Sequence, residues 1–245
     1  MKKYIPNTLT LLNLFCGSIA VIFVLNDDFV TGSLFVFFGI FFDFFDGLAA
    51  RKLNVQSELG LQLDSLADMV TCGLVPGLIM YKLLALSDTT WGHSDIDYSN
   101  LNFSNINVLP LLGLFITLAS AYRLAKFNLD EDQQTYFKGL PTPANALFII
   151  SLPLIMEFQN SDYMNAIILN KWFLIIITLV SCYMLNSGIK LFALKFKNWN
   201  FKANATRYIF IFLCALFIII LQFAAIPIII LTYIGMSLLD NVTSK

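Results

Sequence analysis

Eight apolar segments follow one another along this chain and occupy most of its 245 residues. A helix needs about 20 mostly apolar residues to cross the hydrocarbon core of a bilayer, and these segments are near that length. Charged residues make up only 13% of the sequence, against about 25% in soluble domains. The pattern predicts an all-α, polytopic integral membrane protein with about eight transmembrane helices. The expected segments are residues 7–25, 30–51, 58–86, 107–127, 143–159, 171–188, 207–223 and 226–240.

The basic residues are distributed unevenly between these segments. If the N-terminus lies in the cytoplasm, all of the 15 Lys and Arg residues except Lys82 and Lys171 lie on or near the cytoplasmic side, in keeping with the positive-inside rule. The stretch 87–105 has acids and no Lys or Arg, whereas 189–206 has lysines and no acid. We therefore expect both termini to be cytoplasmic, in a bacterial cell membrane.

Charge and cysteine content exclude several other classes of protein. The formal net charge is -1, so the chain lacks the basic excess typical of proteins that bind nucleic acid. The four cysteines lie inside apolar runs, without the spacing of a zinc site or a disulfide framework. No repeat or low-complexity linker divides the chain. We expect residues 1–245 to form a single domain embedded in membrane lipids.

Four aspartates lie within the second and third segments, where insertion of a charge at the helix centre costs roughly 2.5 to 3.5 kcal/mol. Asp43 and Asp46 are spaced i, i+3, and Asp64 and Asp68 are spaced i, i+4, so each pair shares a helical face. An antiparallel hairpin would bring the two pairs together. Such a cluster cannot stay fully ionised unless cations neutralise it, and hard oxygen ligands suit Mg²⁺, Mn²⁺ or Ca²⁺. Two such ions would form a clamp for phosphoryl transfer.

Small and basic residues beside the aspartates favour the same chemistry. Gly47 and Ala50 continue the face of the first pair, and Gly60 precedes the second pair by one turn, which leaves room for a ligand. Arg51 could reach a phosphate through its planar guanidinium.

Three other interpretations of the aspartates remain. One is an ion-pair network that only locks the hairpin, although a single arginine cannot neutralise four acids. A cation transporter is a second, although its acids would follow a path across the membrane, whereas these gather at one end. A noncatalytic scaffold is the third.

The spacing Asp43-x2-Asp46-Gly47-x2-Ala50-Arg51-x8-Gly60-x3-Asp64-x3-Asp68 resembles in full the signature of the CDP-alcohol phosphotransferase family of membrane enzymes. The resemblance implies a six-helix core, a homodimer, a cytoplasm-facing site with two divalent ions (Mg²⁺ or Mn²⁺), and transfer of a phosphatidyl-type group with release of CMP. It implies that the four aspartates bind metal, with Asp68 also the general base. The residues that it places along the CDP site are Gly47, Ala50, Arg51 and Gly60.

Further segments within residues 5–150 resemble the phosphatidylserine synthase branch of this family, among them Pro6-Asn7-x2-Thr10-x2-Asn13-Leu14-x2-Gly17. This resemblance implies transfer from CDP-diacylglycerol to L-serine. Arg123 and Lys126 end the fourth segment on the side of the aspartates, where they could hold the donor diphosphate or the acceptor carboxylate; membrane anchoring is the alternative for Lys126.

Arg123 and Lys126, together with the polar Asn128 and Asn145, form the candidate acceptor set. It is sparse for a dianionic acceptor such as glycerol 3-phosphate. The nearest alternative is the same reaction with glycerol 3-phosphate or an inositol compound.

Overall fold

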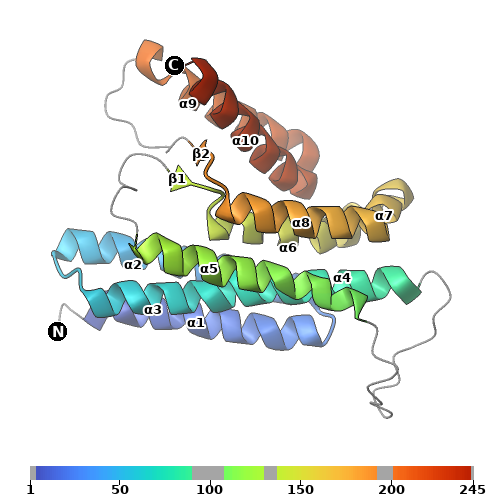
Figure 1. Cartoon of the computed structure of the whole chain (residues 1–245), viewed down its shortest axis with the longest axis horizontal. Coiled ribbons are helices and arrows are strands. Elements are labelled where there is room, and N and C mark those ends of the chain that lie inside the picture. Colours follow the sequence, from blue (N-terminus) through green and yellow to red (C-terminus); the bar gives the residue numbers. More distant parts are fainter. Residues whose placement is uncertain (1–3, 90–107, 130–136, 192–200, 244–245) are drawn as a thin grey trace.

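A computed structural model describes residues 4–89, 108–129, 137–191 and 201–243. The acidic stretch around His93, together with Lys2, Lys3, Lys195 and Lys197, lies outside these residues. Figure 1 shows an arrangement of long helices with one very short pair of strands. The elements are α1 (Tyr4–Leu25), α2 (Phe29–Leu53), α3 (Glu58–Asp68), the π-helical turn η1 (Met69–Leu74), α4 (Val75–Thr89), the 3-10 turn η3 (Leu109–Leu114), α5 (Phe115–Leu129), β1 (Phe137–Lys138), α6 (Thr142–Phe158), α7 (Asp162–Ile168), α8 (Lys171–Asn186), β2 (Lys190–Leu191), α9 (Phe201–Leu221), the 3-10 turn η4 (Gln222–Ala224) and α10 (Ala225–Thr243).

Helices occupy all eight predicted segments, which confirms the all-α, polytopic class. In the described part of the chain, five helical stretches are long and apolar enough to cross a membrane, or six if the bent pair α7 and α8 is one span; α6, with 17 residues, is shorter. The last stretch, Arg207–Leu239, folds back on itself at Gln222, where φ is 49°. The rings of Phe210 and Tyr233 accordingly lie 5.7 Å apart, and α9 packs against α10.

Capping residues set the reversal between α2 and α3. Asn54 ends α2 in the left-handed conformation, with φ 52°, which asparagine tolerates better than most residues. Ser57 begins α3, and its Oγ accepts a hydrogen bond from Gly60 N at 3.1 Å. The chain therefore turns back within a few residues, and α1 packs against both helices.

Helix α2 packs closely against α1 and η1 at Gly39. A Cβ atom at Gly39 would lie 2.6 Å from Thr71 Cγ2 and 2.8 Å from Asn13 Oδ1, so no larger residue fits without a shift. Close packing at this level places polar side chains of α1 beside the aspartates.

The third predicted segment is a helix with a change of type in its middle. Its π-helical turn η1 begins directly after Asp68 and is held from both sides by hydroxyl groups. Thr71 Oγ1 donates to Asn13 O at 3.2 Å, and Thr117 Oγ1 of α5 donates to Gly73 O at 3.1 Å. Such turns are frequent at functional sites, and this one fixes the end of the helix that carries two aspartates.

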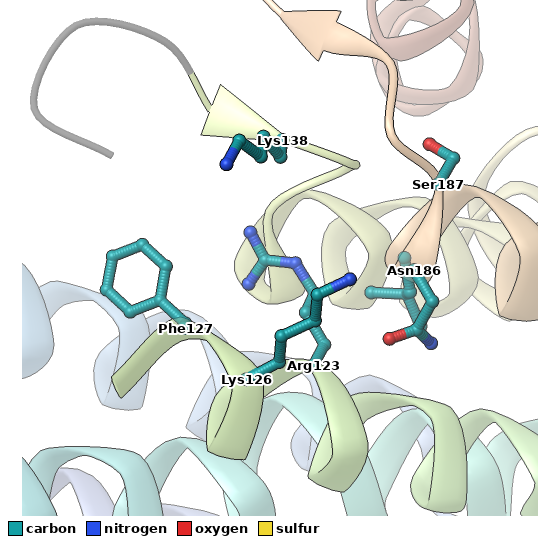
Figure 2. Close-up of a pocket in the computed structure, with 7 residues that line it drawn as sticks. Arg123, Lys126, Phe127, Lys138, Asn186 and Ser187 are labelled. Carbon is teal, nitrogen blue, oxygen red and sulfur yellow. The ribbon is translucent and has the colours of Figure 1, made fainter. Parts of the chain in front are cut away.

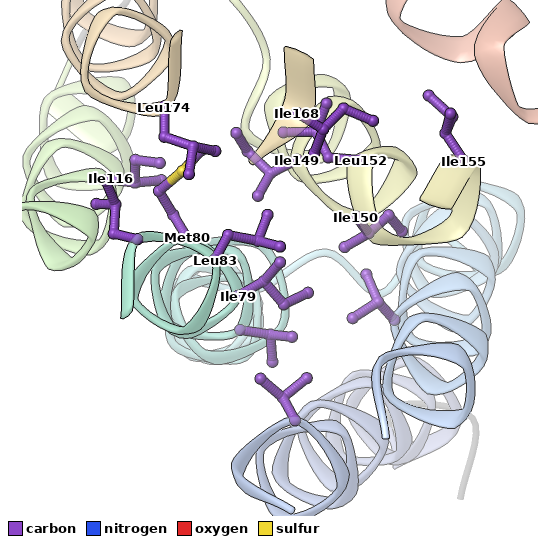
Figure 3. Packing of buried hydrophobic residues seen from close by; sticks show 14 of the residues in the cluster. Ile79, Met80, Leu83, Ile116, Ile149, Ile150, Leu152, Ile155, Ile168 and Leu174 are labelled. Atoms are coloured by element: carbon purple, nitrogen blue, oxygen red, sulfur yellow. The ribbon is translucent and has the colours of Figure 1, made fainter. Parts of the chain in front are cut away.

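The main hydrophobic core lies between α4, α5, α6 and α8, and Figure 3 shows its packing. Its fully buried side chains include Ile79, Met80, Leu83, Ile116, Ile149, Ile150 and Leu174.

A smaller cluster of Leu140, Met184, Leu191 and Ile230 supports the strand pair. Strands β1 and β2 pair antiparallel, with Lys138 opposite Lys190, and Leu140 N donates to Met184 O at 2.9 Å. This ladder brings Lys138 beside the C-terminal end of α8.

Gln159, which follows α6, joins the last two helices to the rest of the protein. Its Nε2 donates to Leu221 O at 3.0 Å, and its Oε1 accepts from Ala224 N at 3.1 Å. One side-chain amide therefore binds the backbone on both sides of the turn between α9 and α10.

Candidate active site

The predicted aspartates meet where α2 lies near α3. Asp43, Asp64 and Asp68 each offer a carboxylate oxygen, and these three atoms lie within 4.8 Å of one another. Asp68 is only 8% exposed, and Asp64 Oδ1 is buried without a hydrogen-bond partner in the part of the chain that the structure describes. A buried carboxylate oxygen without a partner is costly unless a cation binds it. This hard oxygen donor set therefore fits a divalent cation.

Asp46 is placed differently from the other three. Its Oδ2 accepts a hydrogen bond from Thr10 Oγ1 of α1, and the side chain lines a cleft next to the cluster. The structure thus brings three of the four predicted ligands into one group and sets Asp46 beside them, buried and held by α1.

Helix α1 supplies a second contact, because Asn13 Nδ2 donates to Asp68 Oδ1 at 3.2 Å. Thr10 and Asn13 are spaced i, i+3, so both reach the aspartates from one face of α1. The sequence analysis gave neither residue a role in the site. The available signal was a polar pair at helical spacing inside an apolar segment, and both side chains are buried.

A cleft of about 450 Å³ opens beside Asp46 and Asp64, within the size range of small-molecule sites. All four residues predicted to line a CDP site are in its wall, between α1 and the α2–α3 turn. Sequence reasoning did not identify the polar residues of that turn. The wall is formed by Pro6, Asn7, Thr10, Asp46, Gly47, Ala50, Arg51, Val55, Gln56, Ser57, Glu58, Gly60, Leu61 and Asp64.

Arg123 of α5 lies near Asp68 and has the opposite charge. It is 8% exposed, and its Nε has no hydrogen-bond partner within residues 4–89, 108–129, 137–191 and 201–243. Figure 2 shows Arg123, Lys126 and Lys138 around a small hollow of about 20 Å³ that Asn186 and Ser187 also line. A hollow with three basic side chains favours an anionic group.

Asn128 has a different environment. Its Nδ2 donates to Ser65 Oγ at 3.0 Å, which ties α5 to α3. Arg123 and Lys126 line the hollow, whereas Asn128 is in the wall of neither the hollow nor the cleft among the described residues.

Several known proteins are similar in sequence to this chain. The chain is 33% identical over 154 residues to a Bacillus subtilis protein named CDP-diacylglycerol--serine O-phosphatidyltransferase, covering 61% of this chain and 75% of that protein. Proteins with the same name from Helicobacter pylori and Methanocaldococcus jannaschii are 29% and 27% identical, covering 84% and 67% of this chain and 79% and 66% of those proteins. The CDP-alcohol phosphatidyltransferase model matches residues 3–184, a range that contains all four aspartates, the cleft and Arg123. The chain belongs to the CDP-alcohol phosphatidyltransferase family.

Proposed function

We propose that this protein transfers the phosphatidyl group of CDP-diacylglycerol to the hydroxyl group of L-serine, giving phosphatidylserine and CMP. The observation that carries the proposal is the position of the cluster formed by the half-buried Asp43 and Asp64 and the buried Asp68. Asp64 of this cluster lines a cleft large enough for a nucleotide, and Asp68 lies near Arg123, which lines a small cationic hollow. The names of the similar proteins support serine as the acceptor.

The cleft suits the nucleotide part of the donor. Gly47, Ala50 and Gly60 have small side chains or none, so the CDP moiety can approach the backbone of α2 and α3. Arg51 is exposed at the cleft and can direct its planar guanidinium at a phosphate. The diacylglycerol chains would remain in the bilayer beside these helices.

The aspartate cluster suits divalent cations, and we propose that it binds two Mg²⁺ or Mn²⁺ ions. Asp43, Asp64 and Asp68 would hold these ions, and Asp46 at the edge of the cleft would complete the set of ligands. When bound, such ions supply positive charge that stabilises the donor diphosphate and the departing phosphate. Thr10 and Asn13 hold Asp46 and Asp68 in fixed orientations by hydrogen bonds.

In the reaction, Asp68 accepts the proton of the serine hydroxyl group as its oxygen forms a bond to the lipid-linked phosphorus. The phosphoanhydride bond to CMP breaks, and CMP departs with the electron pair. Arg123 and Lys126 bind the serine carboxylate and so hold the hydroxyl near Asp68. Catalysis then consists mainly of positioning and electrostatic stabilisation.

We also propose that the site and both termini face the cytoplasm of a bacterial cell, that residues 1–245 form one membrane domain, and that two chains form a homodimer. The first proposal is supported by the basic residues at the aspartate end of the described helices: Arg51, Lys52, Lys126, Lys138 and Lys190.

The deciding experiment measures CMP release from CDP-diacylglycerol by the purified protein with one acceptor at a time. L-Serine should support turnover, with phosphatidylserine identified by mass, while glycerol 3-phosphate and inositol should not. Turnover with either of those and none with serine would retain the family chemistry and refute serine as the acceptor.

A further inference from the structure

The amide of Asn186, at the C-terminal end of α8, has a fixed orientation in the wall of the cationic hollow. Its Nδ2 donates to Ala119 O at 3.0 Å and to Cys182 O at 3.4 Å. Both amide hydrogens are therefore engaged, and the oxygen is the atom that remains. Asn186 Oδ1 is buried and has no hydrogen-bond partner among the described residues. Buried acceptors in proteins normally have a hydrogen-bond donor. The described residues supply none to this oxygen, so we expect the donor to belong to a ligand.

The surroundings of this oxygen define the group that could supply the donor. Residues of the last turn of α8 line the hollow, and that turn contains no basic residue. The C-terminal end of a helix has partial negative charge, which favours a cation. Opposite it lie the basic side chains of Arg123, Lys126 and Lys138 (Figure 2). A simple cation would be repelled by these three, whereas a molecule with both a carboxylate and an ammonium group matches both sides.

We propose that Asn186 Oδ1 accepts a hydrogen bond from the ammonium group of the amino-acid acceptor, while Arg123 and Lys126 bind its carboxylate. The assignment rests on the proposed function and adds to it a residue that selects zwitterions. A neutral amide oxygen can bind an ammonium group without forming an ion pair with Arg123. An aspartate at this position would form that ion pair. Acceptors without an ammonium group leave this buried oxygen unpaired, which costs binding free energy.

The first test needs only the unmodified protein and two analogues of serine. 3-Hydroxypropanoate has the hydroxyl and the carboxylate but no ammonium group, and ethanolamine has the hydroxyl and the ammonium group but no carboxylate. We expect kcat/KM for CMP release to be at least about 10-fold lower with either analogue, the scale of one hydrogen bond to a charged group. Equal use of serine and 3-hydroxypropanoate would overturn the role of Asn186. A failure to use serine at all would instead refute the proposed function.

The second test uses variants of Asn186. Asn186→Leu should raise KM for serine by about 10-fold or more and leave KM for 3-hydroxypropanoate and CDP-diacylglycerol unchanged. Asn186→Gln retains an amide oxygen, so it should keep more of the use of serine than Asn186→Leu does. Thr178→Val is the matched control, because in the described part of the chain Thr178 Oγ1 bonds only within α8, to Leu174 O at 2.8 Å. Equal losses with both acceptors in the Asn186 variants would show that the amide only joins α8 to α5, and would overturn the proposal.

Discussion

The side-chain amide of Asn13 on α1 donates a hydrogen bond to Asp68 Oδ1 over 3.2 Å, at a position where Asn13 itself is fully buried. The backbone carbonyl of Asn13 also accepts from Thr71 Oγ1 at 3.2 Å, so the residue is held from the π-helical turn that follows Asp68. Helix α1 therefore determines where the carboxylate of the proposed general base points.

Replacing Asn13 by Ala should lower kcat by about 10- to 100-fold, the scale of a hydrogen bond to a charged group, with a smaller change in KM for CDP-diacylglycerol. Steady-state CMP release measures both constants. Ser18→Ala is the matched control, because Ser18 is exposed on the same helix and bonds only to Leu14 O. Full kcat in Asn13→Ala would refute the positioning role.

Substituting Asn for Asp43, Asp46, Asp64 or Asp68 removes charge with little change in volume. Each change should reduce activity by at least about 100-fold, the scale of losing one electrostatic contact in the transition state. Chelation should abolish activity, and Mg²⁺ or Mn²⁺ should restore it. Asp28→Asn is the control, because Asp28 caps α2 at its other end and asparagine caps equally well. Full activity in excess chelator would contradict the metal-dependent mechanism.

Removing the Arg123 side chain as Arg123→Ala should raise KM for serine more than KM for CDP-diacylglycerol, because the proposal assigns its guanidinium to the acceptor carboxylate. The measurement is CMP release with each substrate varied in turn. A larger effect on the donor constant would reassign Arg123 to the diphosphate.

Adding a methyl group in Gly39→Ala should lower the free energy of unfolding in detergent by about 1 to 3 kcal/mol, the usual cost of overpacking. The new Cβ would meet Thr71 and Asn13, so activity should fall as well. Gly235→Ala is the matched control, because a Cβ there meets no atom within 4 Å. Equal stability of the two variants would contradict the close packing of α1 against α2.

The sidedness of the site can be tested by labelling single cysteines in intact cells, after replacing Cys16, Cys72, Cys182 and Cys214. A cysteine at Ser161, exposed beyond α6 at the end remote from the aspartates, should react with an impermeant reagent. One at Lys52, exposed at the end of α2 near the aspartates, should be protected. The opposite pattern would place the aspartates on the outer face.

The order of helices and the meeting of the aspartates could be predicted from local pattern. Apolar length identifies the helices, and the spacing of Asp64 and Asp68 places both on one face. The π-helical turn at Met69–Leu74 could not be predicted, because it depends on contacts with distant residues: Thr71 Oγ1 donates to Asn13 O of α1, and Thr117 Oγ1 of α5 donates to Gly73 O. The short helix α7 lies in a stretch that the sequence analysis left between two segments.

The hollow was predicted only in part for a similar reason. Arg123 and Lys126 share one helix end and follow a recognisable pattern. Lys138 and Asn186 join them only through the pairing of β1 with β2 and the hydrogen bond from Asn186 to Ala119, which link residues far apart in the chain. No local spacing reports such contacts.

The contact of Gln159 with both sides of the last turn has a consequence for biosynthesis. Its partners, Leu221 O and Ala224 N, are translated more than 60 residues after it, since the two hydrogen bonds span 62 and 65 positions. Every residue placed in the active site, up to Asn186 and Ser187, has left the ribosome before that turn. The hairpin of α9 and α10, which lies beyond the family match at residue 184, is therefore added to a bundle whose catalytic residues are already present. The two hydrogen bonds of Gln159 can therefore form only after this hairpin has been made.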